Sequence, residues 1–97
     1  MFFHTALFRW KEGTTPQEVA AVRSALEAMV PDIPEIRHYR VGADAGLVEG
    51  NWDFVVVADF DDEAGWRAYT AHPVHQSIIA ELIRPLVAER AAVQSAG

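Results

Sequence analysis

The chain contains no cysteine, which excludes disulfides, thiolate nucleophiles and cysteine-based zinc sites. It has no apolar run long enough to span a bilayer, and its amino terminus lacks the charged and apolar segments of a signal peptide. Positive charge is scarce: 8 Lys and Arg stand against 14 Asp and Glu, and the net charge is −6. This charge argues against binding to nucleic acids or anionic membranes. Because the sequence shows neither a membrane span nor a signal peptide, we expect a cytoplasmic protein.

What is present suits one small globular domain. Of the 97 residues, 51% are hydrophobic and 23% are charged, and there is no low-complexity run. We expect a single domain over residues 1–97. Because a chain of this length buries a core with little surplus stability, self-association is a common remedy.

The pattern of apolar residues predicts the order strand, helix, strand, strand, helix, strand. Strands are predicted at 2–11, 36–41, 52–60 and 87–94. The first helix begins with Thr15 as N-cap, Pro16 at the first helical position and Glu18 completing a capping box, and it ends at Pro31. The second helix follows the acidic residues 61–63. The order predicts a ferredoxin-like α+β sandwich, with one antiparallel sheet covered on one face by two helices.

Both faces of the strands at 2–11 and 52–60 are apolar, although two helices can cover only one. The face expected toward the helices carries His4, Ala6, Phe8, Trp10, Trp52, Phe54, Val56, Ala58 and Phe60. The opposite face still carries Phe3, Leu7, Val55 and Val57. Because an exposed apolar patch on a small domain usually marks an interface, we predict a homodimer with the two open sheet faces packed together.

The segment from Tyr69 to His75 contains the side chains best suited to catalysis or ligand binding. It places one phenol and two imidazoles around Pro73, which should stop the helix at His72 and open the next one. Side chains at such a junction can project into a cavity. His72 and His75 are therefore the first candidates for chemistry.

Taken together, these features resemble the Dabb family, the stress-responsive dimeric α+β barrel proteins. The resemblance covers nearly the whole chain and implies the same dimeric barrel that the two-faced strands predict. Its most specific part is Tyr69 followed by His72-Pro73-Val74-His75. The other matching positions are His4, Phe8, Lys11, Pro31-Asp32-Ile33-Pro34, Val41-Gly42, Trp52-Asp53-Phe54 and Phe60-Asp61-Asp62.

Plant polyketide cyclases of this family use a tyrosine and the second histidine of the motif, in a pocket between sheet and helices. The resemblance thus implies Tyr69 and His75 as catalytic residues. His75 would be the general base of a cofactor-independent cyclase or isomerase, and Tyr69 would orient it or stabilise an enolate oxygen. The chain departs from one such cyclase at Phe54, where the cyclase has a histidine, so its particular substrate does not carry over.

We expect the pocket to bind a small, flat, hydrophobic molecule. The residues expected to line it are His4, Phe8, Trp10, Phe54, Trp66 and His72.

Simpler alternatives stay open. Tyr69 and His75 could form a buried hydrogen-bonded pair that only locks the helix junction, and His72 could be structural. His4, His72 and His75 could in principle hold a metal, but a zinc site would normally include cysteine or a carboxylate, and we predict neither metal nor cofactor. A non-catalytic, stress-associated dimer is a second function, and a monooxygenase of the same barrel superfamily ranks last.

Overall fold

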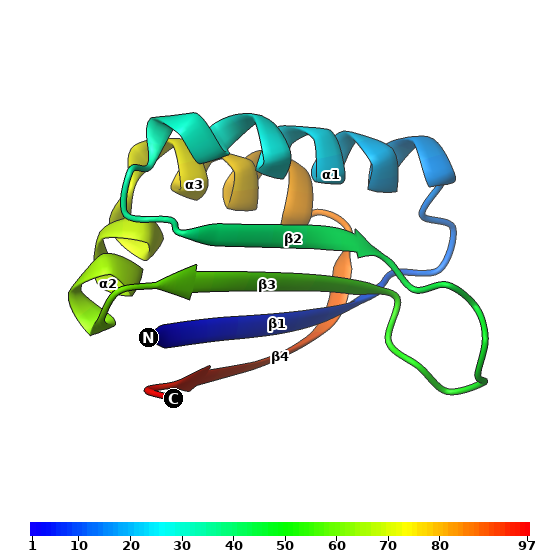
Figure 1. Cartoon of the computed structure of the whole chain (residues 1–97). Coiled ribbons are helices and arrows are strands. Elements are labelled where there is room, and N and C mark those ends of the chain that lie inside the picture. Colours follow the sequence, from blue (N-terminus) through cyan, green and yellow to red (C-terminus); the bar gives the residue numbers. More distant parts are fainter.

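The structure, a computed structural model, describes residues 1–97 as a four-stranded antiparallel sheet with helices on one side (Figure 1). The strands are β1 (Phe2–Trp10), β2 (His38–Ala43), β3 (Phe54–Phe60) and β4 (Val87–Ser95). The helices are α1 (Pro16–Met29), α2 (Glu63–Ala71) and α3 (Pro73–Ile78), with a 3-10 turn η1 (Val30–Asp32) and a π-helical turn η2 (Ile79–Ile83). The strand order β2-β3-β1-β4 confirms the predicted ferredoxin-like sandwich.

The start of α1 confirms the predicted capping box. The Oγ1 atom of Thr15 accepts a hydrogen bond from the Glu18 amide (3.2 Å), and the Glu18 carboxylate accepts one from the Thr15 amide (2.9 Å). Val22, Leu26 and Met29 then fall on one face of the helix and are buried. This face fixes α1 on the sheet.

β2 and β3 begin later than the sequence pattern predicted. β2 starts at His38 rather than Ile36, because the Ile36 amide donates to the Ile33 carbonyl in a turn. β3 starts at Phe54 rather than Trp52, because Asp53 is held by bonds outside the regular ladder. Its amide donates to the Phe8 carbonyl (2.9 Å), and its carboxylate accepts from the Trp10 amide (2.9 Å).

The two faces of the sheet differ as the alternation predicted. The helix-covered face is buried, and it includes Ala6, Phe8, Phe54, Val56, Ala58 and Phe60. No element covers the opposite face, where Phe3 is 38% exposed and Val93 is 64% exposed. The prediction that Trp52 lies on the helix-covered face is wrong. This residue precedes the strand, lies near Leu7 and Val55, and stacks under the guanidinium of Arg9 at 4.5 Å.

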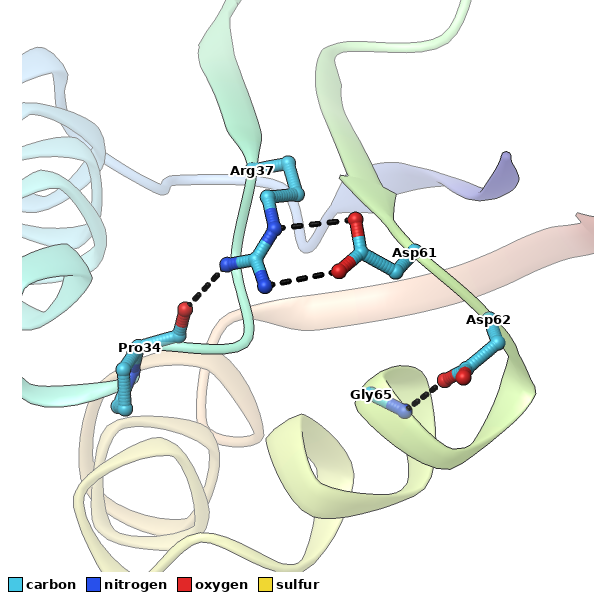
Figure 2. Close-up of polar contacts among 5 residues, drawn as sticks. All are labelled: Pro34, Arg37, Asp61, Asp62 and Gly65. Carbon is cyan, nitrogen blue, oxygen red and sulfur yellow. Dashed lines mark hydrogen bonds and ion pairs between the residues drawn. The ribbon is translucent and has the colours of Figure 1, made fainter.

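Polar contacts at the end of β3 fix the start of α2, which carries Tyr69 (Figure 2). The guanidinium of Arg37 donates twice to the Asp61 carboxylate, at 3.0 and 2.8 Å, and once to the Pro34 carbonyl at 2.6 Å. The next residue, Asp62, is the N-cap of α2 and accepts from the Gly65 amide at 3.0 Å.

Gly65 lets the first turn of α2 pack closely on β3. A Cβ atom at this position would lie 3.3 Å from Cβ of Phe60, which is fully buried. The helix therefore lies against the sheet at its beginning and directs Tyr69 into the space between the layers. No helix in the structure is long and apolar enough to cross a membrane.

Candidate functional site

The junction between α2 and α3 lies where Pro73 predicted it. α2 ends at Ala71, His72 adopts an extended conformation (φ −65°, ψ 132°), and Pro73 opens α3. The Nδ1 atom of His72 accepts a hydrogen bond from the Val74 amide at 3.2 Å. His72 is thus the N-cap of α3, and it does not line the cavity described next.

A cavity of about 160 Å³ lies between the sheet and the helices, and we call it the histidine cavity. Of the residues predicted for the pocket, it brings together His4, Phe8, Trp66, Tyr69 and His75. The rest of its wall consists of Ala6, Leu26, Tyr39, Val56, Thr70, Gln76, Ile79, Ile83 and Arg90. Ile79 and Ile83 bound the π-helical turn η2, a rare geometry that is frequent at functional sites.

Tyr69 contacts His75 through its ring and bonds elsewhere through its hydroxyl. The two ring centroids are 4.1 Å apart at an interplanar angle of 39°. The Tyr69 hydroxyl is hydrogen-bonded to the hydroxyl of Tyr39 at 3.0 Å. The alternative of a hydrogen-bonded Tyr69–His75 pair is therefore wrong. Burial raises the pKa of Tyr69 to about 12 and also raises the pKa of Tyr39, so both phenols stay protonated at neutral pH.

His4 lies on β1 and is only 5% exposed. The amide nitrogen of Gln94 on β4 lies 2.8 Å from its Nδ1 atom. Because an amide nitrogen can only donate, Nδ1 is the acceptor, and the neutral imidazole carries its proton on Nε2. Burial, with smaller contributions from the neighbouring Arg90 and His75, lowers the pKa of His4 to about 4.

His75 is 7% exposed, and its Nδ1 atom is buried without a hydrogen-bond partner. Burial lowers the pKa of His75 by more than a backbone contact with Thr70 raises it, so its imidazole is neutral at physiological pH. A neutral imidazole can accept a proton, although a lowered pKa makes it a weaker base. The indole nitrogen of Trp66 is also buried without a partner. Two residues of the cavity wall thus each carry a buried nitrogen without a hydrogen-bond partner, which is unusual for a buried polar group.

Three residues of the site were missed by the sequence reasoning: Tyr39, Arg90 and Gln94. Tyr39 could have been found from the alternation in β2, because Tyr39 and Val41 share the helix-covered face. Arg90 and Gln94 required the register of β4, in which Arg90 pairs with Phe8 and Gln94 with His4. Paired residues lie on the same face of a sheet, and no sequence signal gives this register.

Two of the residues that were predicted to line the pocket are found in a different hollow. Trp10 and Phe54 lie in an open groove of about 420 Å³ beside the start of α1, together with Arg23 and Asp53. They were misplaced because they share the sheet face of His4 but lie at the far end of β1 and the start of β3. The groove is larger than the histidine cavity, but no histidine or tyrosine lines it. No group of three or more His, Cys, Asp and Glu side chains could hold a metal ion.

A family model for the stress-responsive A/B barrel domain (Dabb) matches residues 2–95. The chain belongs to the Dabb family. Solved structures agree with this assignment. A dimeric ferredoxin-like protein of unknown function from Thermobifida fusca YX is 49% identical, with a TM-score of 0.92, over 99% of this chain and 90% of that one.

More distant relatives share the fold of this Dabb domain. A Dabb family protein from Mesorhizobium loti MAFF303099 is 18% identical, with a TM-score of 0.82, over 99% of this chain and 95% of that one. A hydroxynitrile lyase from Passiflora edulis is 13% identical, with a TM-score of 0.82, over 97% of this chain and 85% of that one. No curated protein sequence matches the chain.

Proposed function

We propose that this Dabb protein binds a compact, largely apolar molecule in the histidine cavity. The observation that carries the proposal is a mostly apolar cavity whose wall includes His75, a buried histidine with one nitrogen, Nδ1, that has no hydrogen-bond partner of normal geometry. A buried polar atom without a partner costs about 1–3 kcal/mol, and a ligand that hydrogen-bonds to it would remove this cost. Trp66 supplies a second unpartnered nitrogen to the same wall.

The size of the cavity limits the ligand. Its volume of about 160 Å³ is below the ~300–1,000 Å³ of pockets for drug-sized ligands. We therefore expect a molecule built around a single flat ring, lying near the aromatic side chains of Phe8, Trp66 and Tyr69.

Nuclear magnetic resonance titration with benzamide, a flat neutral probe, tests the proposal. The chain has three tryptophans, and each reports on a different place: Trp66 on the histidine cavity, Trp10 on the open groove and Trp52 on the open sheet face. Binding in the cavity should shift the Trp66 indole resonance and leave the other two unchanged. A shift confined to Trp10 would move the site to the groove and contradict the proposal.

A pair of variants in the π-helical turn provides the control. Ile79 lines the cavity, whereas Leu82 in the same turn does not, and both are half-buried. Ile79→Phe should fill part of the cavity and weaken the titration of Trp66. Leu82→Phe adds the same volume outside the cavity and should leave it unchanged. Equal effects of the two substitutions would argue against binding in the cavity.

Proton transfer by His75 is a second candidate function, favoured by the same free nitrogen. A neutral imidazole beside a protonated phenol could take a proton from a carbon next to a carbonyl, as in a cyclase or isomerase. Deuterium exchange at the methyl group of acetophenone in D₂O measures this step directly. The wild-type protein should exceed an equal concentration of free imidazole, and His75→Gln should not. An exchange rate no higher than that of imidazole would eliminate this candidate.

We also propose that two copies associate through the open sheet face. Its apolar side chains include Phe3, Leu7, Val55, Val57, Ala91 and Val93. The 49% identical protein from Thermobifida fusca is described as dimeric, which supports the same assembly here. Packing the two faces together would remove this apolar surface from water. Sedimentation equilibrium that shows a monomer at micromolar concentration would overturn the proposal.

A further inference from the structure

The only charged side chain in the wall of the histidine cavity is that of Arg90. Arg90 comes from β4, where it pairs with Phe8 and so faces the helix-covered side of the sheet. Neither Asp nor Glu lines the cavity. The cavity therefore presents one positive charge with no negative charge to balance it, in a chain whose net charge is −6.

The guanidinium of Arg90 is also free of partners elsewhere. Four other arginines form ion pairs with carboxylates, namely Arg9, Arg23, Arg37 and Arg67. Arg90 forms none, as is also true of Arg40 and Arg84, and its side chain is exposed to solvent while lining the cavity. Its neighbour Glu89 contacts Arg9 instead. Since β-strand side chains alternate between faces, Glu89 lies on the open side of the sheet while Arg90 faces the cavity.

The other polar groups of the cavity complement such a charge. The guanidinium lies close enough to His4, Tyr69 and His75 to lower the pKa of each. All three are uncharged at neutral pH, so they do not compete with a ligand for the guanidinium. Arginine presents its donors in a planar fork that matches a carboxylate, which makes it well suited to bind one.

We propose that the ligand of the histidine cavity carries an anionic group, a carboxylate on a flat apolar body, and that Arg90 binds this group. The inference rests on the proposed function and narrows it to one class of ligand. Phe8, Trp66 and Tyr69 contact the apolar body, and the carboxylate lies at the β4 side of the cavity.

Benzoate and benzamide test the charge preference, because they have the same shape and differ in charge. Benzoate should bind roughly tenfold more tightly than benzamide, as measured by the titration of the Trp66 indole resonance. Arg90→Gln should remove this preference, because it should weaken benzoate binding much more than benzamide binding. Arg90→Lys should keep part of the preference, because it retains the charge and loses the fork.

Arg84 offers a matched control. It is exposed at the end of η2, forms no ion pair and does not line the cavity. Arg84→Gln changes the net charge by the same amount as Arg90→Gln and should leave the preference for benzoate intact. Loss of the preference in both variants would attribute it to net charge and overturn the inference.

The remaining outcomes separate the inference from the proposed function. Equal affinities for benzoate and benzamide, or a preference that persists in Arg90→Gln, would overturn the role of Arg90 while the cavity stays a binding site. If neither probe shifts Trp66, the proposed function fails and the inference fails with it.

Discussion

The hydroxyls of Tyr39 and Tyr69 are hydrogen-bonded to each other at 3.0 Å, and this bond joins β2 to α2 in the wall of the histidine cavity. Only one of the two protons is used in the bond. When Tyr39 is the donor, the proton of Tyr69 is free to bind a ligand oxygen. The bond therefore holds Tyr69 in place beside His75 and still leaves its hydroxyl able to donate to a ligand.

The tyrosine pair should be visible in a double-mutant cycle. Tyr39→Phe and Tyr69→Phe each leave one buried hydroxyl without its partner, and each should lower the free energy of unfolding by about 1–2 kcal/mol. The double variant leaves no unpaired hydroxyl, so its loss should be smaller than the sum. Urea denaturation measures all three variants. Strictly additive losses would mean that the two hydroxyls do not interact.

His72 should contribute to stability through its capping bond. His72→Ala removes the acceptor for the Val74 amide and should lower the free energy of unfolding by about 1 kcal/mol. His72→Asn supplies another side chain that favours this position and should recover most of the loss. If Asn destabilised the protein as much as Ala, packing of the imidazole rather than capping would be the cause.

Features that depend on neighbours along the chain were predictable, and features that depend on strand pairing were not. Pro73 sets the break at His72, and Thr15 with Glu18 sets the start of α1, because caps and proline effects act over a few residues. The contact between His4 and Gln94 joins residues 90 positions apart. It depends on the register of β1 with β4. The sequence of β4 does not specify this register, because its small and polar residues show no clear apolar face.

The same limit explains why the pocket was only partly predicted. The alternation in β1 correctly placed His4, Phe8 and Trp10 on one face. It did not show how far along the strand each helix would reach. The strand rises about 3.3 Å per residue, so Trp10 lies well beyond His4 and reaches the groove beside α1 instead of the histidine cavity.

Stability should decrease as the pH falls from 6.5 toward 4, because of His4. Its pKa is lowered from 6.5 to about 4 in the folded protein. In this window the unfolded chain takes up a proton and the folded chain does not, so the folded state loses stability, by at most about 3 kcal/mol. His75, whose pKa is also lowered, acts in the same direction.

Chemical denaturation at several pH values checks this prediction, with nuclear magnetic resonance titration of the His4 imidazole alongside it. His4→Gln should flatten the pH dependence below 6.5. A His4 resonance that titrates near 6.5 in the folded protein would contradict the assignment. The cation of Arg90 lies near both histidines, so Arg90→Gln should raise the pKa of His4.

A single charge on the open sheet face should dissociate the proposed dimer. Val57 lies on β3 at the centre of this face and pairs with Thr5 of β1. In a face-to-face dimer, Val57→Glu would bury an unpaired carboxylate in each subunit and bring two like charges together, which is strongly unfavourable. Ser24→Glu places the same charge on the exposed face of α1 and serves as the control. Sedimentation should show a monomer for Val57→Glu and a dimer for Ser24→Glu. A dimer that survives Val57→Glu unchanged would mean that the subunits meet elsewhere, because no sheet-to-sheet packing can leave this central side chain in water.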